Sequence, residues 1–148
     1  MKDKVIDIII FIFWLLTVII YPMLISIYVT LPLFIGFAGL MLVLGIEKDR
    51  YWQIALVILY MINLEINLSL PLLLIPISVV LFMFLVKPRL SFLKMCPVCI
   101  KVVTVISINL IYFILLYGID FATNQSSVKY DSFLLFSLVY DIIAAVLI

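Results

Sequence analysis

No charged residue occurs between Ile8 and Ile46. The hydrocarbon core of a bilayer is about 30 Å thick, and a helix crosses it with roughly 20 apolar residues. The uncharged stretch is too long for one such span and is about right for two. It is continuously apolar rather than alternating, which favours helices over barrel strands. The whole chain is 69% hydrophobic and 11% charged, well outside the range of soluble domains, so the sequence predicts an integral membrane protein.

Hydropathy and turn residues divide the 148 residues into six predicted spans of one polytopic transmembrane domain. The predicted spans cover residues 5–21, 25–46, 51–65, 70–86, 97–117 and 132–148. The first two are expected to separate at Pro22, and no internal repeat is apparent. Because no small-residue cleavage site follows the N-terminal stretch, we expect that stretch to remain as the first span. The predicted fold is an all-α bundle of about six short transmembrane helices.

The basic residues predict the orientation of this bundle. With the N-terminus in the cytoplasm, Lys129 is external and all the other basic residues are cytoplasmic: Lys2, Lys4, Lys48, Arg50, Lys87, Arg89, Lys94 and Lys101. Such a bias is typical of short cytoplasmic loops, so both termini are predicted to be cytoplasmic. The orientation of the protein in the membrane and contact with anionic lipid head groups explain these basic residues. Because the net charge is only +1, we expect no surface that binds nucleic acid.

Catalytic residues are scarce. The chain has no histidine, which removes the commonest metal ligand and the usual general base. The four glycines form no phosphate-binding loop. Gly36 and Gly39 in "GFAG" instead suggest a close approach of helices. The loops are too short for a soluble catalytic domain, so we expect a non-enzymatic protein without a cofactor or metal.

The chain's two cysteines form the motif "CPVC", Cys96 to Cys99, at the predicted start of the fifth span. A C-x-x-C pair at a helix N-terminus can act as a redox dithiol. The predicted topology places it in the cytoplasm, where thiols stay reduced, and Pro97 suits the first helical turn. An inert reduced pair is therefore the first interpretation. A redox site and a metal site shared between two copies of the chain are the alternatives.

Asp141 lies near the middle of the last predicted span. A carboxylate at that depth costs about 2.5–3.5 kcal/mol on insertion scales, so its side chain is expected to face protein and to be protonated or paired. Ser137, Ala144 and Ala145 share its side of the helix and predict a packing face. Asn109, in the fifth span, is the predicted hydrogen-bond partner of Asp141. A proton or ion relay is the alternative interpretation.

Polar residues alternate at the end of the third span, where Asn63, Glu65, Asn67 and Ser69 follow one another at every second position. The topology places them at the outer interface, where a turn of the chain would explain them. Ser69, two residues before Pro71, predicts the start of the next helix. Glu65 is the candidate for an outward-facing recognition point for a partner or ligand.

The stretch "WQIALVILYMINLEINLSLPLLLIP", with Glu65 as its acidic residue, and the last span, "SFLLFSLVYDIIAAVLI", resemble the MreD family of the bacterial cell-elongation machinery. The resemblance covers most of the chain at the level of hydropathy, although residues 51–65 lack the glycines usual in that family. It implies a bundle of about six helices in the bacterial inner membrane with both ends in the cytoplasm. It also implies a scaffold that binds MreC and, through it, the MreB filament and the peptidoglycan-synthesising enzymes.

Two other functions fit the sequence. The same fold is similar to that of the substrate-binding subunits of energy-coupling-factor vitamin transporters. This similarity implies a small-solute carrier, in which Glu65, Asn63 and Asn67 would line a pocket open to the outside. The third function is a membrane thiol-redox protein that uses Cys96 and Cys99.

Overall fold

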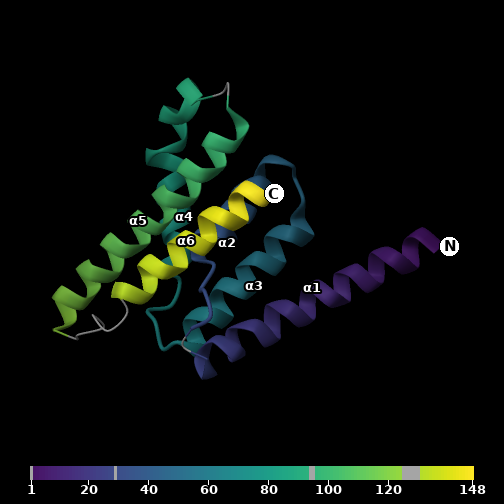
Figure 1. Cartoon of the computed structure of the whole chain (residues 1–148), viewed down its shortest axis with the longest axis horizontal. Coiled ribbons are helices and arrows are strands. Elements are labelled where there is room, and N and C mark those ends of the chain that lie inside the picture. Colours follow the sequence, from purple (N-terminus) through teal and green to yellow (C-terminus); the bar gives the residue numbers. More distant parts are fainter. Residues whose placement is uncertain (1, 29, 94–95, 125–130) are drawn as a thin grey trace.

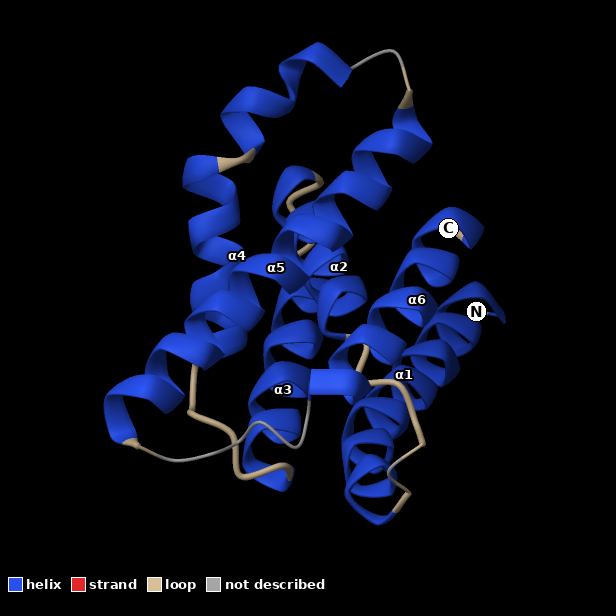
Figure 2. Ribbon diagram, turned by 60° about the vertical axis from the view of Figure 1, so that its left-hand side comes forward, coloured by secondary structure: helices blue, strands red, loops and turns tan. Residues whose placement is uncertain are grey.

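The computed structural model describes residues 2–28, 30–93, 96–124 and 131–148 and is all-helical over these ranges (Figures 1 and 2). Its elements are α1 (Lys2–Ile27), α2 (Ile35–Glu47), α3 (Tyr51–Asn67), α4 (Leu74–Leu85), the 3-10 helix η1 (Lys87–Leu93), α5 (Pro97–Thr123) and α6 (Asp131–Leu147). The predicted all-α class is confirmed, and α1 and α5 are long and apolar enough to cross a membrane. Lys94 and Lys129 of the predicted topology lie outside the described residues.

The predicted break between the first two spans is wrong, because α1 continues through Pro22 and α2 begins only at Ile35. A proline in a helix removes the donor that would bond the carbonyl four residues earlier, here that of Val18. The Nδ2 group of Asn63 in α3 lies 3.2 Å from the carbonyl oxygens of both Val18 and Ile19. A neighbouring helix thus supplies the missing donor, as membrane helices with internal prolines require.

Helices α2 and α4 are much shorter than their predicted spans. They have 13 and 12 residues, which corresponds to lengths of about 20 and 18 Å. Both begin later than expected, because irregular chain precedes Ile35 and Leu74. Conversely, α5 continues to Thr123, beyond its predicted end at residue 117. The starts of α3 and α6 agree with the prediction to within one residue.

Helix α2 is the centre of the bundle, since it packs against α3, α4, α5 and α6. Two of its three glycines, Gly36 and Gly39, make this possible: a Cβ atom on Gly39 would come within 2.8 Å of Ile108 in α5 and 3.2 Å of Val79 in α4. The close helix approach predicted from "GFAG" is therefore present. Among the described helices, α1 packs only against α3, and its N-terminal part extends away from the others (Figure 1).

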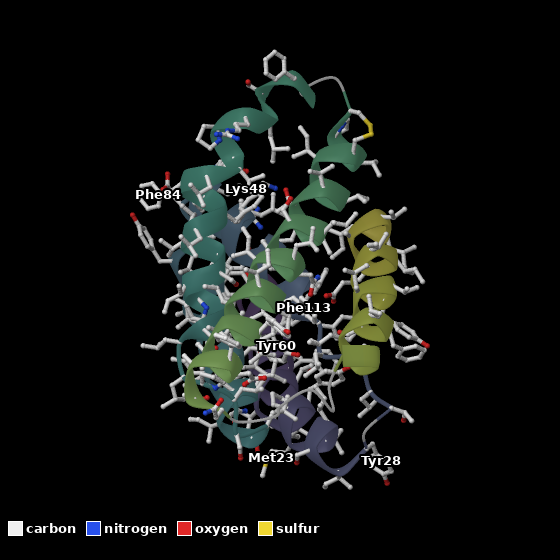
Figure 3. All side chains as sticks on the ribbon, turned by 90° about the vertical axis from the view of Figure 1, so that its left-hand side faces the viewer. Met23, Tyr28, Lys48, Tyr60, Phe84 and Phe113 are labelled. Atoms are coloured by element: carbon white, nitrogen blue, oxygen red, sulfur yellow. A yellow bond between two sulfur atoms is a disulfide. The ribbon has the colours of Figure 1, made fainter. Side chains whose placement is uncertain are left out.

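Two of the basic turns lie at the same end of the bundle. Lys87, at the start of η1, forms an ion pair of 2.9 Å with Glu47, at the end of α2. Lys48 therefore lies near η1, whereas Met23 and Tyr28 lie at the opposite end (Figure 3).

Candidate functional site

The two short helices begin in the same way. We call residues 30–36, "TLPLFIG", the α2 entry and residues 69–75, "SLPLLLI", the α4 entry. Each carries a hydroxyl residue followed by Leu-Pro-Leu, and each reaches its helix through an apolar residue in the left-handed region, Phe34 with φ 51° and Leu73 with φ 66°. The two short helices therefore share a local start pattern, although the rest of their sequences differs. Neither helix has a side-chain cap from its own N-cap residue.

Side chains from three helices bond the backbone of the α2 entry. The hydroxyls of Tyr21 in α1 and Tyr60 in α3 donate to the carbonyls of Pro32 and Leu33, each at 2.8 Å. The Leu33 N–H donates to Ser137 Oγ in α6 at 3.0 Å. Irregular backbone is tolerated inside a membrane protein only where its polar groups are satisfied. These three side chains supply such partners.

Asp141 lies at the N-terminus of α2. Its Oδ2 atom accepts hydrogen bonds from the Gly36 N–H at 2.9 Å and from Asn109 Nδ2 at 3.0 Å. The predicted bond between Asn109 and Asp141 is thus confirmed, and a carboxyl group is well placed at the positive end of a helix dipole. Ser137, Asp141 and Ala145 of the predicted packing face on α6 are buried, whereas Ala144, its fourth member, is half-buried and lines a cavity. The bond to Gly36, 105 residues away in the sequence, was not predicted.

Glu65 has the same role at the α4 entry. Its Oε2 accepts from the Leu73 N–H at 2.6 Å and its Oε1 from the Ile75 N–H at 2.7 Å. The side chain is 0% exposed, so the prediction of an outward-facing recognition point at Glu65 is wrong. Ser69 does not begin the helix either: it lies in the preceding turn with φ 53°, and Glu65 from the end of α3 provides the cap instead.

Asn63 and Asn67 form a connected pair on α3. Asn67 Nδ2 donates to both the backbone carbonyl and the side-chain Oδ1 of Asn63, each at 2.8 Å. This leaves the Asn63 amide N–H groups directed at the two carbonyls near Pro22. Asn63, Asn67 and Glu65 therefore bond groups of their own chain, and none of them lines the cavity described below.

Gly36 is required by the packing around Asp141. A Cβ atom at this position would overlap Asn109 Nδ2 and lie 2.9 Å from Val105 and 3.0 Å from Asp141 Oδ2. We expect Gly36→Ala to lower the free energy of unfolding by about 1–3 kcal/mol, the usual cost of overpacking. Unfolding in detergent micelles measures this cost. Gly118→Ala is the control, since a Cβ atom there meets no other atom within 4 Å.

The structure joins Cys96 and Cys99 by a disulfide, with Cα atoms 5.2 Å apart (Figure 3). This differs from the expected reduced pair, because the start of α5 brings residues three positions apart next to each other. Cys96 is the N-cap of α5 and its Sγ accepts from the Cys99 N–H at 3.3 Å, while Pro97 lies in the first turn as predicted.

A cavity of about 440 Å³ lies beside the α2 entry, between α1, α2 and α3. We call it the α1–α3 cavity. Its lining is mostly apolar and aromatic and includes Trp14, Phe37, Trp52 and, from α6, Ala144. No pattern in the sequence indicates this cavity, because its walls come from helices whose relative tilt no local pattern encodes.

Comparison with models of known protein families, with curated proteins and with solved structures finds no match for this chain. Within the part of the chain that the structure describes, no three Cys, Asp or Glu residues lie close enough together to hold a metal ion. The buried polar residues that looked most like a site instead hold the two helix entries in place. The surfaces left for function are the α1–α3 cavity, the disulfide and the exposed faces of the helices.

Proposed function

We propose that this chain is a non-enzymatic, multi-pass protein of a bacterial inner membrane and acts as a scaffold in a cell-envelope complex. The resemblance to the MreD family implies this role, with an MreC-like membrane protein as the partner. The observation that carries the proposal is the isolation of α1 from most of the bundle.

Helix α1 offers a long surface for a partner. Its 26 residues extend for about 39 Å, and α3 is its only neighbour among the described helices. Large apolar side chains, each at least 47% exposed, recur on it at alternating intervals of four and three residues: Ile9, Phe13, Leu16, Ile20, Met23 and Ile27. This is the spacing of helices that pack side by side along their length. We therefore assign this stripe, the α1 stripe, to a transmembrane helix of the partner.

The charged ends of the helices support the proposed topology of six spans. The Glu47–Lys87 ion pair brings the turn after α2 and the turn after α4 to one end of the bundle, as expected if both turns are cytoplasmic. Figure 2 draws the two chain ends on the same side of the molecule, although in Figure 1 the N-terminal end of α1 extends well beyond the C-terminal end of α6. Both termini in the cytoplasm are consistent with this arrangement.

Purification in mild detergent tests the proposal. We expect the tagged full chain to co-purify with at least one larger membrane protein. Alanine at Phe13 and Ile20 together should abolish this association, because it removes the centre of the α1 stripe. Alanine at Ile114 and Leu135, which are exposed on α5 and α6, is the matched control and should leave it intact. Isolation of a monomer with a bound vitamin-like solute would contradict the scaffold role.

Thiol–disulfide exchange is a second candidate function, favoured by the disulfide at the N-terminus of α5. In such a step a substrate dithiol would be oxidised to a disulfide while Cys96–Cys99 is reduced to two thiols. The exchange passes through a mixed disulfide. If this candidate is correct, the Cys96 thiolate of the Cys99→Ser variant should attack the disulfide of an oxidised substrate and release one substrate thiol. With no second thiol to resolve it, the mixed disulfide should accumulate and be visible on non-reducing gels. Absence of any such adduct in living cells would exclude it.

A further inference from the structure

We propose that the α1–α3 cavity binds one acyl chain of an anionic phospholipid, whose phosphate pairs with Arg50. This inference is independent of the scaffold role, because it concerns the opposite side of α1 from the α1 stripe. It rests on the hydrogen bonds that the lining side chains already make, on the position of Arg50 and on the volume of the cavity.

The hydroxyl and amide side chains that line the cavity already donate hydrogen bonds within the chain. The hydroxyls of Tyr21 and Tyr60 donate to the α2 entry. Gln53 Nε2 donates to the Met41 carbonyl at 3.1 Å, and Thr17 Oγ1 donates to its own helix at 2.9 Å. A polar solute would therefore lose its contacts with water and find few donors here, at a cost of several kcal/mol. An apolar chain has no such cost.

Arg50 is the one charged residue among those lining the cavity. It is exposed in the turn between α2 and α3, two residues before Trp52. Glu47, the acidic residue at the end of α2, pairs with Lys87, and no ion pair joins Arg50 to a carboxylate of the described residues. A guanidinium binds phosphate oxygens through two parallel hydrogen bonds. In the proposed topology this end faces the cytoplasmic leaflet, where anionic head groups are concentrated.

The size of the cavity favours a lipid chain over a partner's helix. A volume of about 440 Å³ is within the range of small-molecule pockets, roughly 300–1,000 Å³. A helix about 10 Å in diameter would fill that volume with only about one turn. Because α1 packs against α3 and no other described helix, a chain can enter from the bilayer between α1 and α6, where Ala144 forms the far wall.

Photolabelling in vesicles tests this assignment. The full chain is reconstituted with phosphatidylglycerol that carries a photoreactive acyl chain, or with the matching phosphatidylcholine. We expect label on residues that line the cavity, and more from phosphatidylglycerol than from phosphatidylcholine. Arg50→Gln should reduce the phosphatidylglycerol signal about tenfold, the effect of losing one charge-assisted contact.

A substitution that fills the cavity provides the second part of the experiment. Ala144→Trp should abolish label inside the cavity with both lipids, whereas Val146→Trp, at an exposed site on α6 outside the cavity, should not. Elution as a single monodisperse species establishes that each variant is folded, and Ala144→Leu replaces the larger substitution if it is not. Label spread over the exposed faces of α1 and α5, without dependence on head group or on Ala144, would overturn the proposal.

Discussion

Replacing Asp141 with leucine is expected to lower the free energy of unfolding by about 2–6 kcal/mol, one of the two largest effects of a single substitution in this chain. The side chains are similar in size, so the loss comes from hydrogen bonding. The Gly36 N–H loses its acceptor, and Asn109 Nδ2 loses one of its two acceptors and keeps the Val105 carbonyl. Each buried N–H that loses its acceptor costs about 1–3 kcal/mol. Reversible unfolding in mixed detergent micelles measures the change.

Asp141→Asn distinguishes this structural role from a proton or ion relay. The amide retains an oxygen that can accept from both Gly36 and Asn109, but its NH₂ group takes the place of Oδ1, which is buried without a hydrogen-bond partner. We therefore expect a cost of about 1–3 kcal/mol, smaller than that of Asp141→Leu. No ionisable side chain forms a hydrogen bond with Asp141 in the described part of the chain. If Asp141→Asn keeps the fold but abolishes function as completely as Asp141→Leu, the relay is correct and the structural interpretation is wrong.

The second large effect is expected at Glu65. In Glu65→Leu the N–H groups of Leu73 and Ile75 lose bonds of 2.6 and 2.7 Å, and the α4 entry should open. We expect a loss of about 2–6 kcal/mol in unfolding free energy, from two orphaned donors again. Amide hydrogen exchange over residues 69–75 should rise strongly, because these bonds hold the first turn of α4 in place.

Glu47 provides the control for Glu65. It is also acidic and paired, but its side chain is 46% exposed in the ion pair with Lys87. Exposed ion pairs contribute about 0–1 kcal/mol, so Glu47→Leu should have little effect on stability or on exchange. Equal effects of the two substitutions would show that Glu65 acts through its charge alone and not as the cap of α4.

The sequence predicted the helical segments and one of the buried contacts. Long apolar runs determine where helices form, and consecutive spans can be expected to touch, so the pairing of Asn109 with Asp141 followed from local order. The continuation of α1 through Pro22 could not be predicted from local sequence. The carbonyl of Val18, which Pro22 leaves without its helical donor, is bonded by Asn63, 45 residues away, and no local rule for proline includes such a partner.

The role of Glu65 was missed for a related reason. Capping patterns place the polar residue within a few positions of the helix it caps, whereas Glu65 lies at the end of the preceding helix and reaches across a turn to Ile75. One signal in the sequence could have been used: the repeated "TLPLFI" and "SLPLLL" marks both helix entries. Two similar segments inside apolar sequence indicate two short helices that begin in the same way. The backbone N–H groups at both helix starts then need a hydrogen-bond acceptor.

With these polar residues assigned to the fold, the proposed function depends on the exposed face of α1. The central claim is that a partner's transmembrane helix lies along the α1 stripe. Phe13 and Ile20 are 66% and 47% exposed on this face, and substitutions there should leave stability nearly unchanged. This separates them from Asp141 and Glu65, whose substitution should destabilise the chain itself.

Site-specific photo-crosslinking in living cells tests this claim most directly. A photoreactive amino acid is placed at Phe13 or Ile20 on the α1 stripe, or at the control positions Ile114 on α5 and Leu135 on α6, which are exposed to a similar or greater extent. We predict a discrete adduct with one membrane protein from the two α1 positions and no such adduct from the two controls. Lipid adducts alone at all four positions would contradict the scaffold function.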